Sequence, residues 1–381
     1  MADDLLLEKV HDLSDLELAI LLCLVSREHG IISTPSDTID DLIEELQLVA
    51  RKTFGLSCVV INCHAGTTLE EFASALLYLP KPAAAAATTP ARTPSFQTRS
   101  DSASYFVANP QQHSRPSRGS ISPLTVLTGG GGGGGVGGFG PAAQIANCVL
   151  ARNLDRAPRA VQIQALELLR TRRIFTRTSV QAAPKQFVFV PVLEADSGGE
   201  AHVTPHLNDF FSLAHWHDPE DGLVNMEEAA DDAASVESVV RSKHQDELPA
   251  GPSISESEIS HLAQLSQQVQ ADIDVIRYQM NVVSFLRMHR AVDHGITPAA
   301  TKHFDKLMRC VAPLHKLDYV TPALVGLAAR KVYLHRIRIT SPAKERSMQW
   351  GSKLEAVQSI LDGVGPEEVI EEVLEMVTAP L

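Results

Sequence analysis

The chain has 381 residues, of which 33 are Lys or Arg and 46 are Asp or Glu, so its formal net charge is −13. This length suggests about two or three domains, and a hydrophobic fraction of 44% is enough to build a core. The longest apolar run, residues 18–25, is far shorter than the ~20 residues of a membrane span. The acidic N-terminus lacks the basic region of a signal peptide. We therefore expect an intracellular protein, cytoplasmic or nuclear, with no membrane partner.

The negative charge is concentrated in one part of the sequence. Residues 194–260 hold 16 acidic and 2 basic residues, so the rest of the chain is close to neutral. Residues 152–177 contain seven arginines, which we interpret as the solvated face of a helix and its exit. Contact with a phosphate or an acidic partner is the alternative. A nucleic-acid partner is not expected, because such proteins usually carry a larger basic surface.

Cysteine usage argues against structural crosslinks. The five cysteines are scattered along the chain and form no CxxC pair. This pattern disfavours a disulfide framework and a structural zinc site, so no metal site is predicted. We expect most of the cysteines to be small buried residues in a reducing compartment.

Residues 1–79 are predicted to form the first part of an α/β core. A capping box from Ser14 to Glu17 precedes an apolar helix. Residues 30–32 are typical of a short buried strand, and the helix after it is expected to start at a cap formed by Ser36.

The same alternation continues to residue 78. Gly55 ends the second helix, and residues 58–61 predict another buried strand. A capping box from Thr67 to Glu70 then predicts a helix to about residue 78. Helices that alternate with buried strands indicate a parallel sheet covered on both faces.

Residues 80–144 differ sharply in composition. They are rich in Ala, Ser, Thr and Pro and contain seven consecutive glycines at 129–135. We predict a disordered insertion, because so little apolar surface cannot offset the entropy of ordering the chain. No strand precedes the glycines and no Lys-Ser or Lys-Thr follows them, so a flexible linker is favoured over a phosphate loop.

The remaining chain divides into three predicted parts. Residues 145–225 form the second part of the core, with strands at 145–150 and 187–190 and a helix opened by Pro158. Residues 226–257 are a loose acidic segment. Residues 258–381 are predicted to form an all-helical domain, with helices near 258–290, 298–314, 321–337 and 366–378.

One stretch of this second half carries a family resemblance. Residues 145–158 and the helix through 167 resemble the second nucleotide-binding motif of AAA+ ATPases of the MoxR and magnesium-chelatase branch. In that branch a hydrophobic strand ends in Asp-Glu, then comes an Asn-Arg-Ala-Pro turn and a helix containing Ala-Leu-Leu-Glu. Here residues 155–158, Asp-Arg-Ala-Pro, correspond to the turn, and residues 164–167, Gln-Ala-Leu-Glu, to the helix.

Further segments follow in the order that the family has. Residues 21–32 resemble the helix and strand before the phosphate loop, and residues 60–62 resemble the next strand. Residues 184–190 resemble the first-sensor strand, and residues 207–210 the arginine-finger motif. The helical lid is resembled by residues 295–298 and 319–337. The sequence is also similar to fungal proteins described as magnesium-chelatase-like. The resemblance implies an AAA+-like αβα core with a parallel sheet, followed by a helical lid, with ATP and Mg²⁺ as the family's cofactors.

ATP hydrolysis needs a glycine-rich loop with a Lys, acids for Mg²⁺ and water, and positive charge at the γ-phosphate. None of the corresponding positions suits these roles. The loop at 33–40 has no glycine and places an acid where the Lys belongs, and an Arg and an Asn replace Asp-Glu. The first-sensor, arginine-finger and second-sensor positions are also changed. The degenerate positions are Asp40, Arg152, Asn153, Glu194, Asp209 and Ala299.

Three functional hypotheses remain. The first is a non-hydrolysing scaffold or regulatory subunit with an AAA+-like core, no cofactor, and protein partners or self-assembly through AAA+-like packing. The second is an active ATPase of the magnesium-chelatase or MoxR type, which would use ATP and Mg²⁺. The third is a metal- or porphyrin-binding module that uses histidines such as His215 and His217, although a turn explains that pair more simply.

Overall fold

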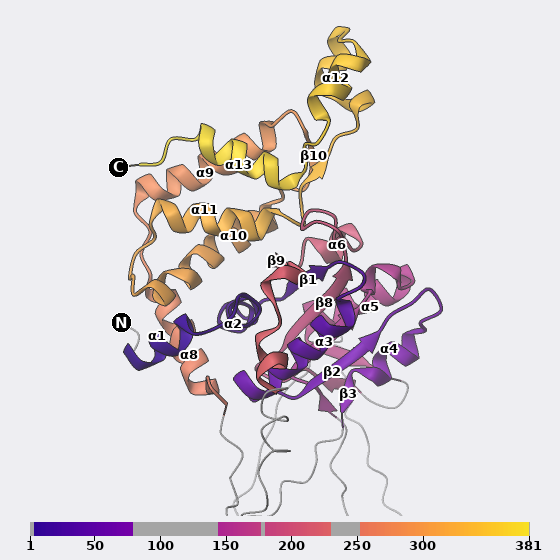
Figure 1. The fold of residues 1–381 in the computed structure, drawn as a ribbon, viewed down its shortest axis with the longest axis vertical. Coiled ribbons are helices and arrows are strands. Elements are labelled where there is room, and N and C mark those ends of the chain that lie inside the picture. The colour runs from indigo at the N-terminus through magenta and orange to yellow at the C-terminus, as the bar shows by residue number, and fades with distance from the viewer. Residues whose placement is uncertain (1–3, 79–143, 177–179, 230–251, 381) are drawn as a thin grey trace, which may run out of the picture. The chain divides into compact units, whose positions relative to one another are not determined.

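The computed structural model describes residues 4–78, 144–176, 180–229 and 252–380 (Figure 1). Apart from its last residue, the predicted insertion 80–144 lies outside these described residues, and so does most of the acidic segment 226–257. The described parts of residues 1–79 and 143–381 form one compact unit. The finer domain boundaries drawn from the sequence stay predictions.

Five strands form one sheet, in the order β2-β5-β8-β1-β9, and all four neighbouring pairs are parallel. Each strand is a short run rich in Val, Ile, Leu or Ala. β1, β5, β8 and β9 are almost wholly buried, as expected for strands covered on both faces, whereas the edge strand β2 is only partly buried. The predicted parallel sheet is therefore confirmed. In chain order the strands are β1 (Gly30–Thr34), β2 (Cys58–Asn62), β5 (Cys148–Arg152), β8 (Val188–Glu194) and β9 (Leu213–Trp216).

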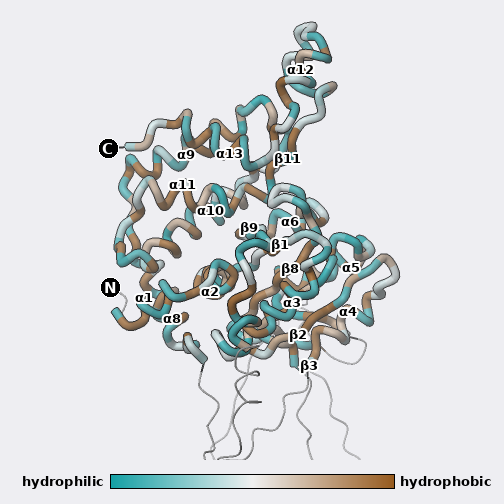
Figure 2. Tube along the Cα trace, viewed as in Figure 1, coloured by the Kyte–Doolittle hydropathy of each residue, from teal (hydrophilic) through white to brown (hydrophobic). Residues whose placement is uncertain are grey.

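Helices cover both faces of this sheet, and alternate residues of each strand serve the two cores. On one face Leu150 and Val190 pack with the apolar sides of α2 (Asp15–Ser26) and α3 (Ile39–Leu48). On the other face Val149 and Phe189 pack with α4 (Leu69–Ala75) and α5 (Arg159–Thr171). With helices on both faces of the sheet, the core is an αβα sandwich. Figure 2 shows hydrophobic stretches along α2 and the strands.

The second half of the chain is mainly helical. α10 packs on α11, and α13 packs on both α9 and α11 (Figure 1). A two-stranded antiparallel pair, β10 with β11, connects to these helices. Together they form the predicted helical domain: α8 (Glu256–Gln268), α9 (Ile273–Met288), β10 (Val292–His294), α10 (Pro298–Val311), α11 (Pro322–Tyr333), β11 (Arg338–Ile339), α12 (Leu354–Leu361) and α13 (Pro366–Met376).

Short elements fill the connections. They are α1 (Asp4–His11), a π-helical turn (Val49–Thr53), β3 (Leu77–Tyr78), β4 (Gln144–Ile145), β6 (Arg173–Phe175), β7 (Val180–Ala182) and α6 (Pro205–Asn208). Single 3₁₀ turns lie at Leu154–Arg156, Pro219–Asp221, Ala312–His315, Pro342–Lys344 and Arg346–Trp350.

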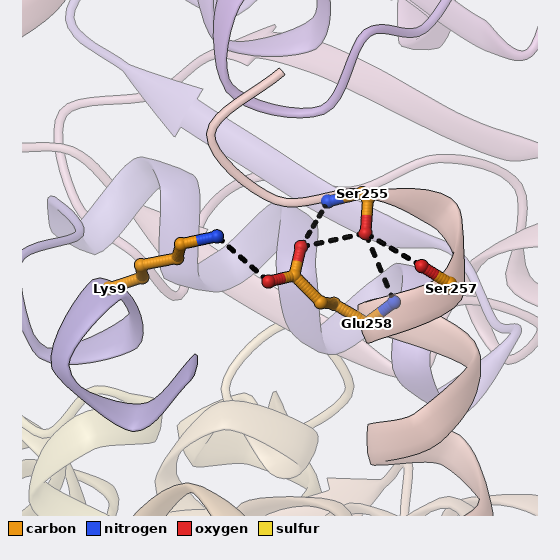
Figure 3. Close-up of polar contacts among 4 residues, drawn as sticks. All are labelled: Lys9, Ser255, Ser257 and Glu258. Carbon is orange, nitrogen blue, oxygen red and sulfur yellow. Dashed lines mark hydrogen bonds and ion pairs between the residues drawn. The ribbon is translucent and has the colours of Figure 1, made fainter. Parts of the chain in front are cut away.

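The N-terminus of α8 is fixed by hydrogen bonds and one ion pair (Figure 3). Ser255 and Glu258 form a reciprocal capping box, and Lys9 of α1 donates to the Glu258 carboxylate at 2.8 Å. Burial raises the pKa of Glu258, but the hydrogen bonds from Lys9 and Ser255 outweigh it and hold the pKa at about 2. The contact ties α1 to the helical domain.

Several local predictions were wrong. Ser36 does not cap α3, because its hydroxyl donates to Asp37. Thr38 precedes the helix without a side-chain cap, because its hydroxyl bonds instead with Thr34 Oγ1 and the Pro35 carbonyl oxygen. The second capping box lies one residue later, from Thr68 to Glu71.

The expected strand at 145–150 is divided in two, because the Asn147 side chain hydrogen-bonds to the β2 and β8 ends of the sheet and interrupts it. The helix expected at 258–290 breaks at residues 269–272. There Gln270 forms backbone hydrogen bonds with Asp318 and Val320 instead of continuing the helix. The sequence reading also missed α12.

Candidate functional site

The carboxyl ends of the parallel strands meet at one edge of the sheet. The chain passes from β1 to β2 on one side of β1, and from β8 across to β9 on the other side. In open α/β sheets, ligands bind in the crevice at such a reversal of strand order. The residues at these ends, Thr34, Arg152 and Glu194, therefore define the candidate site.

Arg152 and Asp40 form an ion pair at this edge. Arg152 ends β5, and Asp40 lies in the first turn of α3. Nη1 of Arg152 donates to Oδ1 of Asp40, and Nη2 donates to Oδ2 at 3.2 Å. The Arg152 side chain is 29% exposed and that of Asp40 is 70% exposed. Because both carboxylate oxygens are engaged, the pair is held in the fork geometry that makes Arg–carboxylate pairs strong.

Glu194 is paired in the same way with the turn after β5. Its Oε1 accepts a hydrogen bond of 2.7 Å from Asn153 Nδ2, and its Oε2 accepts one from Arg156. Asn153 adopts a left-handed conformation with φ of +51°, which Asn tolerates better than most residues. Its Oδ1 atom is buried and has no hydrogen-bond partner among the described residues. The free group at this point is thus an acceptor.

The loop from β1 to α3 is closed by its own hydrogen bonds. Thr34 Oγ1 lies 2.8 Å from Thr38 Oγ1 and donates to the carbonyl oxygen of His217 at 3.2 Å. Beside it lies a cavity of about 430 Å³, whose lining includes Asp41 and Glu227. Carboxylates therefore surround the N-terminus of α3, the end that would otherwise attract an anion.

A second group of polar contacts joins the core to the helical domain. Thr297, the N-cap of α10, donates to the Asp209 carboxylate at 2.6 Å. Arg336 is buried and donates to the carbonyl oxygens of Asp209 and Phe211. The carbonyl oxygen of His335 accepts a hydrogen bond of 2.8 Å from the Asn208 side chain. We call these contacts the core–lid latch.

Ionisation of the latch is set by burial. Burial lowers the pKa of Arg336 to about 10, with Asp209 opposing the shift. Burial, and then the charge of Arg336, lower the pKa of His335 well below its usual value. His335 is therefore neutral near pH 7, and its Nε2 accepts a hydrogen bond from Arg336 Nε at 3.2 Å.

Comparisons with known proteins agree with this architecture. Residues 284–358 match the family model of the AAA lid domain. A crystal structure from Cytophaga hutchinsonii, described as a "putative ATPase", superposes with a TM-score of 0.59 at 12% identity, covering 99% of this chain and 94% of that one. The chain has the AAA+ fold. The predicted fold class, an α/β core with a helical lid, is thereby confirmed.

One curated relative matches over part of the chain. The uncharacterized protein YeaC of Bacillus subtilis is 25% identical over 130 residues, which is 34% of this chain. The match spans about a third of that relative, 36% of its length.

The AAA+ fold implies ATP and Mg²⁺, and the residues at the strand ends do not fit them. Mg²⁺ requires oxygen ligands, but Arg152 is a cation. The Asp40 carboxylate already accepts from Arg152. The Glu194 carboxylate already accepts from Asn153 and Arg156. Phosphates require donors, whereas the free buried group is the acceptor Asn153 Oδ1. We therefore derive no catalytic step through ATP.

The structure gathers the predicted positions into two places. Asp40, Arg152, Asn153 and Glu194 lie together at the strand ends. Asp209 lies at the core–lid latch, and Ala299 lies in the first turn of α10 beside it. Among the described residues, no hydrogen bond or ion pair links the two places directly.

The sequence reading missed Arg156 as a partner of Glu194, and it missed the latch residues. Arg156 belongs to the Asp-Arg-Ala-Pro turn and is one of the seven arginines of residues 152–177 that were expected to face solvent. The signal for the latch was His335-Arg336, at the end of the lid motif. Neither the spacing nor the residue types alone indicated that the Arg336 side chain binds backbone carbonyls of the core, or that the His335 carbonyl oxygen accepts from Asn208.

The third hypothesis, a metal- or porphyrin-binding module, concerns the histidines and other metal-ligating side chains. No group of three His, Cys, Asp or Glu residues suited to hold a metal occurs within the described ranges. His215 lies in β9, and its Nδ1 is 3.0 Å from Lys331 Nζ. Burial lowers the pKa of His215 to about 3, so the neutral ring accepts from Lys331. Among the helices of the described residues, none has the length and apolar character needed to cross a bilayer.

Proposed function

We propose that this AAA+-fold protein is a non-hydrolysing scaffold or regulatory subunit, which works through binding to other proteins or copies of itself. The observation that carries the proposal is the ion pair of Asp40 with Arg152. In the resembling ATPases a cation stands at the first position and an acid at the second. Here the signs are exchanged, so the two positions neutralise each other.

Electrostatics oppose a nucleotide at this edge. A unit negative charge 4 Å from another costs about 1 kcal/mol in water and about 4 kcal/mol near a protein surface. Asp37, Asp40 and Asp41 all lie in or just before the first turn of α3, where a phosphate would have to bind. A triphosphate would also have to break the Arg152 pair to gain one cation.

Assembly remains available to such a protein because it needs the fold and not the hydrolysis. The core–lid latch uses only side chains and carbonyls of this chain, so the lid has a defined place on the core without a bound nucleotide. Proteins with AAA+ folds usually assemble into oligomers, and this supports self-association as the working mode. The proposal takes the MoxR or magnesium-chelatase branch as the evolutionary origin of the chain and not as the source of its activity.

The test is isothermal calorimetry of the purified chain with ATP, with and without Mg²⁺, up to millimolar ligand, together with sedimentation velocity. We expect no binding heat, no nucleotide-induced thermal shift, and an oligomeric state that ATP does not alter. Micromolar ATP binding would overturn the proposal and favour the alternative, an active ATPase of the magnesium-chelatase or MoxR type.

A control variant makes a negative result informative. In Asp40→Lys/Arg152→Asp the two charges have the order found in the resembling ATPases, while the pair itself is kept. If this variant gains a nucleotide-induced shift that the natural chain lacks, the exchanged charges are a cause of the lost binding.

A further inference from the structure

Two cysteines face each other in the sheet. Cys58 is the first residue of β2, Cys148 is the first residue of β5, and the strand register pairs them directly. Neighbouring strands lie about 4.8 Å apart, and paired residues in a parallel ladder point to the same face. Disulfides join residues whose Cα atoms are about 4.4 to 6.8 Å apart. A bond between these two sulfurs therefore needs only a small movement, which β2 can make as an edge strand.

The two thiols differ in access. Cys148 is buried in the core, with 1% of its surface exposed, whereas Cys58 is only partly buried. An oxidant in solution reaches Cys58 first. Cys148 can then react only with a group that the fold brings to it, and Cys58 is that group.

The reactivity of Cys58 is also favoured electrostatically. Its hydrogen bond with the Cys148 thiol, helped by the charge of Arg51, lowers the pKa of Cys58, although burial opposes this shift. The same hydrogen bond raises the pKa of Cys148. Burial raises the pKa of Cys63 and of Cys310 to about 11. Because the thiolate is the nucleophile, Cys58 should react before these other cysteines.

We propose that Cys58 is a site of oxidation by hydroperoxides and that Cys148 resolves the product into an intramolecular disulfide. The Cys58 thiolate attacks one peroxide oxygen, so an S–O bond forms, the O–O bond breaks, and the leaving oxygen takes a proton and departs as water or alcohol. The Cys148 sulfur then attacks the Cys58 sulfur, the S–S bond forms, and the hydroxyl leaves as water with the Cys148 proton. The two thiols lose two electrons and the peroxide gains them.

The position of the pair gives the bond a structural consequence. Residues Cys58 to Asn62 pair one by one with Cys148 to Arg152, so the same two strands hold the cysteines at one end and Arg152 at the other. A disulfide would fasten edge strand β2 to the strand that carries Arg152. The inference does not depend on whether ATP binds.

The test uses the full chain treated with hydrogen peroxide, quenched in acid, and digested with pepsin, because acid prevents thiol exchange during digestion. We expect a peptide pair linked through Cys58 and Cys148, whose mass is two hydrogen atoms below the sum of the two free peptides. Alkylation by iodoacetamide at pH 7 should be about tenfold faster at Cys58 than at Cys63. No link in the natural chain, or a link to Cys23 instead, would overturn the proposal.

Variants separate the two steps. In Cys148→Ser, dimedone should trap a sulfenic acid at Cys58, and in Cys58→Ser peroxide should give no disulfide-linked peptide that contains Cys148. Cys63→Ser is the matched control and should form the disulfide at the natural rate. If a variant does not fold, the mapped link and the alkylation rates of the natural chain still decide the question.

Discussion

The ion pair between Asp40 and Arg152 makes a quantitative prediction about stability. The structure determines how much the pair should stabilise the fold. Two hydrogen bonds join the groups, but the Asp40 side chain is 70% exposed and the Arg152 side chain is 29% exposed. Exposed pairs contribute about 0.2 to 1 kcal/mol, and breaking a fully buried pair costs about 3 to 5 kcal/mol. A fork-shaped pair in this setting should therefore have a coupling energy of about 1 kcal/mol, at the upper end of the exposed range.

The perturbation is a double-mutant cycle of Asp40→Asn, Arg152→Gln and their combination, measured by urea unfolding followed by circular dichroism. We expect the losses of unfolding free energy in the two single variants to add up to more than the loss in the double variant. The difference is the coupling energy, which should be about 1 kcal/mol at low salt. The coupling should fall strongly in 1 M NaCl, where the Debye length is about 3 Å. Asp362→Asn, at an exposed acid after α12, is the control and should change stability by less than about 0.5 kcal/mol.

Two outcomes would refute the reasoning. One is a coupling energy near zero at low salt. The other concerns the exchanged pair: Asp40→Lys/Arg152→Asp should be more stable than Asp40→Lys alone, because the single change sets a lysine against Arg152. If the double variant recovers no stability, the pair contributes no measurable free energy and does not support the proposed loss of nucleotide binding.

Two further predictions concern acid and backbone strain. Burial lowers the pKa of His29 and His215 to about 3 and that of His335 far below its usual value, so below pH about 6.5 the unfolded state binds more protons than the folded state. As the pH falls below this value, the free energy of unfolding should decrease by about 1.4 kcal/mol per pH unit for each of these histidines. Urea unfolding curves at pH 7, 6 and 5 that coincide would contradict this. Gly295 has φ of +121°, and a Cβ there would lie 1.9 Å from a carbonyl oxygen, so Gly295→Ala should cost about 3 kcal/mol or more in thermal unfolding. Gly351→Ala, with φ of +84° and open space around it, is the control and should cost only about 1 to 2 kcal/mol; equal losses would refute the steric explanation.

Much of the fold could be predicted because its signals are local. The strands of the sheet are short apolar runs, and the capping box at Ser14 marks the start of α2 within four residues of sequence. Errors arose where a distant segment decided the outcome. The break at 269–272 depends on hydrogen bonds with the segment near Asp318, and the early end of α4 depends on pairing between β3 and β4. No window of sequence around these residues contains their partners.

The candidate site shows the same division. The resemblance located Arg152 and Glu194, because strand ends are fixed by the apolar pattern that precedes them. It did not indicate what these residues bind, since Asp40 is 112 residues away from Arg152 along the chain. The residues alone leave it open whether the arginines of residues 152–177 face solvent or contact a phosphate or an acidic partner. The parallel pairing of β5 with its neighbours sets Arg152 at the strand ends, and α3, which contacts β1 and β8, brings Asp40 to it, so that the two form a salt bridge.

The paired charges and the core–lid latch have a common physical consequence. In a nucleotide-dependent machine, the groups at the strand ends and the contacts of the lid gain part of their partners from the ligand, so both should depend on it. In this chain Asp40 and Glu194 have their partners within the core, and Asp209 has its partner in the lid at Thr297. A ligand that binds these three carboxylates would have to replace hydrogen bonds that already exist, whereas Asn153 Oδ1 and Arg336 Nη1 are buried without a partner among the described residues. Under the proposed scaffold function the chain itself supplies the contacts between core and lid, which is the reason to test assembly before catalysis.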